Sequence, residues 1–324
     1  MRDGRFTHLL IHRDDDVVQT RLGARSVGRV IEVNLGLRGA FIDIAAPTAA
    51  FLPFPRNDRI TQGQRLEVVV TAEPRAGKGA AVRYVGPGEG TPRLIQPAPS
   101  IAEQLRDLVP SEESVTGIAA IDAMVEAGEE ALTQSIVFAS HGIDLAIERT
   151  RALVAVDIDF TSTPGRDPKQ ARAAANREGL KQAARLISLR NWGGLVVIDM
   201  VGDGQDAEAQ SKVVRAAFSQ EPQAVFGPIS RFGLLQMSLP WRRTPIEEIL
   251  LDAGRRPSVQ TRAISVVRAL RRQLLADTLS PRIIARCAPD EALIAHPLAA
   301  RLGPRALIQA DAAIPPGRGR IEEG

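Results

Sequence analysis

The alternation of apolar and polar residues from 153 to 199 predicts a strand, a long helix and a second strand. The first strand, residues 153–159, contains Asp157 and Asp159, and the second, residues 195–199, ends in Asp199. Because side chains alternate across a strand, Asp157 and Asp159 project from the same face. The apolar run 195–198 is continuous, which is typical of a strand covered on both faces. A unit of this length joins parallel strands through a right-handed crossover.

The helix between these strands has clear start and stop signals. Asp167 is a suitable N-cap, and Pro168 at the first helical position already has the required backbone angle. The helical pattern continues through Arg190, and Gly193-Gly194 then allows the chain to turn into the next strand. The residues predicted to be buried on this helix are Ala171, Ala175, Leu180, Ala184 and Ile187.

The segments on either side of this unit differ in pattern. Residues 26–90 contain short runs rich in Val, Ile and Phe, separated by Gly and Pro, which favours a small closed β-barrel of the oligonucleotide-binding (OB) type. The predicted strands are 26–34, 39–44, 51–53 and 65–72, and the loop 86–92 is the predicted boundary. Helical spacing returns at 100–133, 205–219 and 245–285, and further strands are predicted at 224–229, 282–287 and 306–310. The Pro- and Gly-rich tail after residue 314 is predicted to be disordered.

Composition places the chain among soluble globular proteins. It has 324 residues, 44% of them hydrophobic and 24% charged, with a net charge of +3 and a pI of about 9.5. Arg dominates the cations, which makes nucleic acid the first candidate partner. Cys287 is the single cysteine, so a disulfide within the chain and a cysteine-based zinc cluster are both excluded. No apolar window approaches the length of a membrane span or signal peptide, and we expect a cytoplasmic protein.

The three acids of the central unit are the best candidates for chemistry. If the two strands are parallel, Asp157, Asp159 and Asp199 meet at the carboxyl edge of one sheet, where open α/β sheets bind ligands. Oxygen ligands without His or Cys suit a hard cation, so we expect Mg²⁺, with Mn²⁺ as an alternative. The competing interpretation is that these acids cap helices, face water or form ion pairs with nearby cations. Those cations are Arg149, Arg151, Arg166, Lys169 and Arg172.

Seven short stretches occur in a characteristic order and spacing. They are Gly28-Arg29-Val30, residues 39–43 (GAFID), 50–53 (AFLP), 77–81 (GKGAA), 147–159 (IERTRALVAVDID), 189–199 (LRNWGGLVVID) and 229–238 (ISRFGLLQMS). Each is weak alone. Taken together they resemble the bacterial ribonuclease E/ribonuclease G family of endoribonucleases.

The resemblance implies a catalytic magnesium ion held by Asp157 and Asp199 in a DNase-I-like subdomain. The family has Asn where this chain has Asp159, so a third carboxylate can join the site and be both a catalytic group and a metal ligand. A further acid usual in the family is replaced by Gly202, with Asp203 one residue later. The implied partner is single-stranded RNA, and neither a membrane nor DNA is expected.

The resemblance also implies RNA contacts outside the metal site. Phe41 and Phe51 match stacking positions of the barrel and Lys78 a backbone contact, because aromatic faces stack on bases irrespective of sequence. Arg231 lies in a motif near the active site. The alternatives remain open: barrel core for the phenylalanines, a solvated cation for Lys78 and a structural ion pair for Arg231.

Two parts of the family pattern are missing. Residues 90–142 are too few for both the ribonuclease-H-like scaffold and the 5′-monophosphate sensor, and no Cys-x-x-Cys zinc link follows residue 240. We therefore expect no structural zinc, and the oligomeric state is open. The rival function is a non-catalytic RNA-binding protein derived from the same fold.

The fold class predicted from pattern and resemblance is multidomain α/β: an OB-fold RNA-binding barrel, a DNase-I-like/RNase-H-like catalytic domain and a small α+β C-terminal domain. The predicted division has N-terminal strands packed on a scaffold (1–25), the barrel (26–90) and a reduced helical scaffold (91–145). These are followed by the catalytic domain (146–245), the C-terminal domain (246–312) and a disordered tail (313–324).

Overall fold

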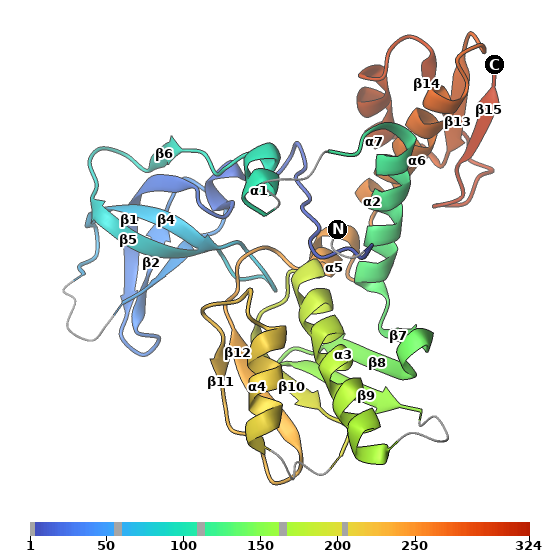
Figure 1. The fold of residues 1–324 in the computed structure, drawn as a ribbon. Coiled ribbons are helices and arrows are strands. Elements are labelled where there is room, and N and C mark those ends of the chain that lie inside the picture. Colours follow the sequence, from blue (N-terminus) through green and yellow to red (C-terminus); the bar gives the residue numbers. More distant parts are fainter. Residues whose placement is uncertain (1–3, 55–59, 109–113, 162–166, 203–206) are drawn as a thin grey trace. The chain divides into compact units, whose positions relative to one another are not determined.

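A computed structural model describes residues 4–54, 60–108, 114–161, 167–202 and 207–324 (Figure 1). The chain forms two compact units. The first comprises residues 1–110 and 131–246, and the second comprises residues 111–130 and 247–324. The mixed α/β class predicted from the sequence is confirmed, since helices and several sheets alternate along the chain.

Five strands of the first unit close into a barrel. They are β1 (Arg25–Asn34), β2 (Gly39–Asp43), β3 (Ala50–Pro53), β4 (Arg65–Ala72) and β5 (Ala81–Pro87). The order is β2-β3-β5-β4-β1, and β1 pairs again with β2, which closes the sheet. Aliphatic side chains such as Ile42, Leu52 and Leu66 fill the interior. The barrel sheet does not end at residue 90 as predicted, because β6 (Arg93–Gln96) pairs with β1.

The strands predicted in residues 1–25 are wrong for the described part of that segment. In the described part of this segment, a 3-10 turn at Val18–Thr20 precedes β1, which begins at Arg25. The backbone around Phe6 is instead held by a side chain, because Arg185 Nη1 donates to the Phe6 carbonyl at 2.7 Å. Leu9 is buried. The apolar run at 9–11 therefore supplies a buried side chain without forming a named strand.

A mixed six-stranded sheet forms the rest of the first unit. Its strands are β7 (Ser135–Phe138), β8 (Ile143–Arg149), β9 (Val154–Phe160), β10 (Gly194–Asp199), β11 (Val225–Phe226) and β12 (Leu234–Leu239). The order is β11-β12-β10-β9-β8-β7, and β9 and β10 are parallel as predicted. Helices α3 (Pro168–Leu189) and α4 (Ala207–Ala217) lie together over one side of it (Figure 1).

One face of this sheet is open, contrary to the prediction that β10 is covered on both faces. Val196 and Ile198 are buried, whereas Leu195 is 46% exposed. The strand β9 shows the same alternation of buried and exposed residues. An apolar run of four residues therefore gave a misleading signal, because Leu195 belongs to the open face.

The start of α3 follows the prediction, and its last residue, Leu189 with Arg190 as C-cap, is within one residue of the predicted end; the residue that stops the helix differs. Asp167 caps the helix by accepting a hydrogen bond from the Lys169 backbone N–H, and Pro168 is its first residue. The helix stops because Asn191 adopts a left-handed conformation with φ of 56°, two residues before Gly193. Arg190, which is 1% exposed, donates from Nη1 to the Ile147 carbonyl at 3.1 Å. This guanidinium joins the end of α3 to β8.

The residues 91–145, predicted to form a helical scaffold, do not form a single domain, because they are divided between the two units. The first helix α1 (Ile101–Leu108) belongs to the first unit, whereas most of α2 (Gly117–Leu132) belongs to the second. In that second unit Arg272 of α6 donates from Nε to Asp122 of α2 at 2.7 Å and from Nη2 at 3.2 Å. The segment 135–145 instead supplies β7, a 3-10 turn at Ala139–His141, and the start of β8.

The C-terminal part of the second unit is a small α+β domain. It contains α5 (Ile246–Leu250), α6 (Val259–Ala276), β13 (Ile283–Cys287), α7 (Pro289–Ala300), β14 (Ala306–Ala310) and β15 (Arg320–Glu323). The predicted disordered tail is wrong, because β15 pairs antiparallel with β13. Arg286 of β13 donates to Glu322 at 2.7 Å, and Ile321 packs on the core of this domain. Among the described helices of the chain, none has the length and apolarity needed to cross a bilayer.

Candidate active site

The strand register places two of the predicted acids side by side. Asp157 of β9 and Asp199 of β10 are direct partners in the parallel ladder. Neighbouring strands lie about 4.8 Å apart, and partners in register project from the same face. Both residues are exposed, on the face opposite the buried Val156 and Ile198. The sheet therefore brings these two carboxylates together on its open face.

A second pair of acids flanks the first. Asp159 lies two residues beyond Asp157 on the same face, and its partner in the antiparallel ladder is Asp144 of β8. Asp144 also accepts a hydrogen bond from the Ser135 hydroxyl at 2.9 Å. The sequence analysis did not single out Asp144. The alternation Ile143-Asp144-Leu145-Ala146-Ile147 was the available signal, since it puts Asp144 on the polar face of a strand.

The electrostatics of this open face favour a cation. Loss of hydration raises the pKa of the Asp157 carboxyl, and the negative charges of Asp159, Asp199 and Asp144 raise it further. Like charges on one face disfavour each other's ionised forms, and a bound cation relieves that repulsion. The donor set therefore fits a hard divalent metal ion.

The ion-pair interpretation is not supported by the described residues. None of Asp157, Asp159 and Asp199 pairs with an Arg or Lys side chain among them. One proposed competitor, Arg149, lies over the Trp241 ring at 6.0 Å, and another, Arg166, lies outside the described residues. The carboxylates thus keep their charge available for a ligand from solution.

The arrangement falls short of a complete protein cage for a metal. Within the described ranges, no three Asp, Glu, His or Cys side chains are grouped so that they hold a metal ion by themselves. Magnesium commonly takes only one or two carboxylates, with water and substrate phosphate as its other ligands. The pair Asp157 and Asp199 is sufficient for such a site. Asp203 of the following loop lies outside the described residues.

A side chain of α3 is hydrogen-bonded to the backbone that follows Asp199. Asn176 accepts a hydrogen bond from the Val201 N–H at 2.8 Å and donates to the Val201 carbonyl at 2.9 Å. Its side chain is 7% exposed. Asn176 does not face solvent, because its amide binds both backbone groups of Val201. The sequence signal was a polar residue beside the buried Ala175 on the inner face of α3.

Arg231 lies in a turn next to Asp199. The strand β12 begins at Leu234, which is the ladder partner of Asp199, and the turn 230–233 comes just before it. Ser230 shapes this turn by accepting hydrogen bonds from the Phe232 and Leu234 N–H groups, both at 3.2 Å. The Arg231 guanidinium lies 4.8 Å from the centroid of the Phe232 ring, which is 72% exposed. In the described structure no acid pairs with Arg231, so the turn presents a cation and an aromatic ring beside the acids.

The two predicted stacking residues of the barrel lie against each other. Phe41 of β2 and Phe51 of β3 are ladder partners, with ring centroids 5.5 Å apart and planes inclined by 62°. Both are partly exposed, and neither belongs to the buried cluster in the barrel interior. A Cβ on Gly39 would lie 2.1 Å from the Phe51 ring, so only glycine at position 39 leaves room for the ring. Barrel core is therefore not the main role of this aromatic pair.

Lys78 closes the tight turn between β4 and β5. Its N–H donates to the Arg75 carbonyl at 2.8 Å, and the Arg75 N–H donates back at 3.2 Å. Ala76 and Gly77 between them have φ of 48° and 73°, as a two-residue hairpin turn requires. The Lys78 side chain is exposed at the turn. This geometry allows contact with a nucleic-acid backbone, and equally a cation in water.

The part of the chain that is similar to known proteins includes the six-stranded sheet and its acids. Residues 96–241 match the model of the Ribonuclease E/G family. This part of the chain, less than half of its length, is similar to the ribonuclease E/G family. The matched range contains Asp157, Asp159, Asp199 and Arg231 but not the barrel residues Phe41, Phe51 and Lys78.

Individual members of the ribonuclease E/G family show the same local similarity. Ribonuclease E of Haemophilus influenzae is 35% identical over 118 residues, which is 35% of this chain and 13% of the relative. Ribonuclease E of Escherichia coli is 35% identical over 119 residues, 35% of this chain and 11% of the relative. Ribonuclease G of Haemophilus influenzae is 28% identical over 154 residues, 44% of this chain and 31% of the relative. The chain thus matches less than a third of each of these relatives.

Proposed function

We propose that this chain is a metal-dependent endoribonuclease that cleaves single-stranded RNA on the open face of the six-stranded sheet. The observation that carries the proposal is the register of β9 and β10, which pairs Asp157 with Asp199 inside the part that matches the Ribonuclease E/G family model. Two adjacent carboxylates without a cationic partner suit Mg²⁺, and Mn²⁺ has the same ligand preference.

Each acid has a distinct place in this proposal. Asp157 and Asp199 would hold the ion, and the chemistry that it would supply is activation of a water molecule and compensation of negative charge on the scissile phosphate. Asp159 lies two residues along β9 on the same face, where its carboxylate would add negative charge at the ion and could serve as a further ligand. Asn176 keeps the backbone after Asp199 in position. Hydrolysis would leave a 5′ phosphate on the downstream product.

Substrate would be placed by groups outside the metal pair. Arg231 in the turn beside Asp199 contacts a phosphate of the RNA, because its guanidinium is directed to solvent over Phe232. Phe41 and Phe51 stack on bases, and Lys78 contacts the backbone. The barrel order β1-β2-β3-β5-β4 with closure onto β1 supports an OB-type fold, whose members bind single strands on aromatic platforms.

A non-catalytic RNA-binding protein is the second candidate. It is favoured by the finding that no group of three metal-holding side chains occurs within the described residues. The retained acids argue against it, because carboxylates on an RNA-facing surface repel phosphate unless a cation lies between them.

A cleavage assay separates the two functions. A labelled AU-rich single-stranded RNA is incubated with wild type, an Asp157→Asn/Asp199→Asn variant and Glu148→Gln, in magnesium or in chelator. Glu148 is the matched control, since it is exposed on the same face of β8. The nuclease proposal predicts cleavage only in magnesium, only by wild type and the control. Cleavage that survives chelation or the double substitution defeats it, and binding without cleavage in all three proteins selects the RNA-binding alternative.

A further inference from the structure

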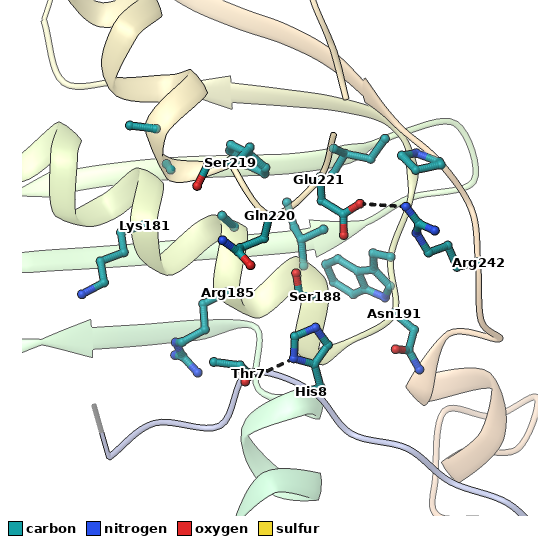
Figure 2. Close-up of a pocket in the computed structure, with 18 of the residues that line it drawn as sticks. Thr7, His8, Lys181, Arg185, Ser188, Asn191, Ser219, Gln220, Glu221 and Arg242 are labelled. Carbon is teal, nitrogen blue, oxygen red and sulfur yellow. Dashed lines mark hydrogen bonds and ion pairs between the residues drawn. The ribbon is translucent and has the colours of Figure 1, made fainter. Parts of the chain in front are cut away.

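A large cavity lies on the helical side of the first unit, away from the open face that carries the acids. Its volume is about 1070 Å³. Side chains from α3, from the end of α4, from the segment after β12 and from the N-terminal segment line it. Figure 2 shows Lys181, Arg185 and Ser188 of α3 facing the segment with Thr7 and His8, and the Glu221–Arg242 pair on another part of the wall. The cavity is large enough for a nucleotide.

The charge of the described cavity lining is predominantly positive. It includes six Arg and Lys residues but three Asp and Glu residues. Glu221 accepts from Arg242 at 3.4 Å, so this pair offsets itself and five cations face two acids; Glu178 accepts from the neutral amide of Gln182 at 2.7 Å. The cations on α3 follow each other at four-residue spacing and so share one side of the helix. The six are Arg177, Lys181, Arg185, Lys212, Arg242 and Arg243.

Arg243 shows that this positive charge extends below the surface. Burial lowers the pKa of its guanidinium, the nearby charges of Glu73 and Glu221 raise it, and the charge of Arg242 lowers it. Its side chain donates to the neutral Gln104 Oε1 at 2.8 and 3.3 Å. The nearby carboxylate of Glu73 accepts from the backbone N–H groups of Leu22 and Thr244. The side-chain hydrogen bonds of Arg243 thus go to a neutral amide rather than to these carboxylates, and its charge adds to the attraction of the adjoining space for an anion.

The rest of the lining is apolar and includes a large aromatic residue. Trp192 and Leu239 contribute to this wall together with small residues of α3 and α4, among them Ala184 and Ala217. The Arg190 guanidinium lies 4.7 Å from the centroid of the Trp192 ring and fixes its position. A cavity with a cationic rim and a flat apolar wall complements a ligand that has a phosphate at one end and a planar ring at the other.

We propose that this cavity binds a phosphorylated ligand of nucleotide size, with the phosphate contacted by Lys181, Arg185 and Arg242 and the base placed against Trp192. The ligand is a ribonucleotide unit, supplied either as a free mononucleotide or as part of an RNA strand. This binding is independent of cleavage, because the cavity shares no residue with the acidic face.

Titration calorimetry on the full chain in EDTA tests the proposal, since chelation removes metal-mediated binding at the acidic face. The probes are AMP, adenosine and inorganic phosphate. We expect one AMP per chain, bound at least about tenfold more tightly than adenosine or phosphate, because AMP alone supplies both parts of the ligand. AMP that binds no more tightly than phosphate overturns the proposal.

Two helix variants locate the binding. Lys181→Gln removes a cation from the cavity, whereas Lys169→Gln makes the same change on an exposed turn of the same helix. The first is expected to weaken AMP binding by about threefold to tenfold, and the second to leave it unchanged. Equal affinities in the two variants contradict the assignment. Displacement of AMP by a short single-stranded RNA assigns the site to an RNA nucleotide, and retention of AMP assigns it to a free nucleotide; both support the ligand chemistry.

Discussion

Removing the Asn176 side chain is expected to weaken both the fold and the candidate metal site. Asn176→Ala deletes one donor and one acceptor that hold the Val201 backbone at 2.9 and 2.8 Å. A buried polar group left without its partner costs about 1–3 kcal/mol, and partial access of water lowers the sum of two such losses. We therefore expect the free energy of unfolding to fall by about 2–4 kcal/mol.

The matched control is Gln170→Ala on the first turns of the same helix. Gln170 is exposed, so this change is expected to alter the free energy of unfolding by less than about 0.5 kcal/mol. Asn176→Asp is more informative still. It keeps the acceptor for the Val201 N–H but puts a carboxylate oxygen against the Val201 carbonyl, so its loss should equal or exceed that of Asn176→Ala and should diminish at low pH, where the carboxyl is protonated.

Urea unfolding gives the stability values, and Mn²⁺ binding at low urea gives the functional effect. Because Val201 follows Asp199 by two residues, a loosened loop should lower metal affinity while the protein is still folded. A purely structural role would change the unfolding midpoint without changing metal affinity. Losses below about 0.5 kcal/mol in both Asn176 variants would show that these hydrogen bonds do not hold the loop.

Three further predictions concern the barrel and the acids. Phe41→Ala should weaken binding of single-stranded RNA by about 1–3 kcal/mol in a fluorescence anisotropy titration, whereas Tyr84→Ala, an exposed aromatic on β5, should not; equal losses would refute stacking on the phenylalanine. Asp159→Asn should lower the pKa of Asp157 in a carbon-detected NMR titration more than Asp144→Asn does, because the charge of Asp159 raises that pKa more than the charge of Asp144 does; no change with either variant would refute the coupling. The raised pKa of Asp157 means that the folded chain binds this proton more tightly than the unfolded chain, so the contribution of Asp157 to metal-free stability should fall as pH rises from the ordinary carboxyl pKa through the raised one. Urea unfolding across that range checks the sign, and a rise in the contribution of Asp157, obtained by difference from Asp157→Asn, would contradict it.

The local pattern was sufficient to predict the central strand–helix–strand unit. Alternation in residues 153–159 gave the shared face of Asp157 and Asp159, and Asp167-Pro168 gave the start of α3. The parallel pairing followed from the length of the crossover. These features depend on interactions within a few residues or on a common topological rule.

The features that were missed depend on distant partners. Asp144 joins the acidic face only because β8 pairs with β9, and pattern within one strand does not specify its neighbour. Asn176 is buried because the loop after β10 needs its hydrogen bonds. The tail is ordered because Arg286 binds Glu322 and Ile321 packs against the core of the second unit. Its Pro and Gly content had predicted disorder.

The second unit shows the same limit. The helical period of residues 117–132 was recognised correctly. The unit on which this helix packs was not predicted, because its contact with Arg272 joins residues 150 positions apart in the sequence. The expected barrel boundary failed in the same way, because β6 follows a loop rich in Gly and Pro and still returns to β1.

Manganese binding measured by electron paramagnetic resonance tests the central claim most directly. Only unbound Mn²⁺ contributes to the signal that is measured. When Mn²⁺ is added to the metal-free wild-type chain, the signal of one ion per chain should be lost. The Asp157→Asn/Asp199→Asn variant should bind at least about tenfold more weakly, while Glu148→Gln on the same face keeps its affinity. An unchanged affinity in the double variant would contradict the assignment of the metal to Asp157 and Asp199.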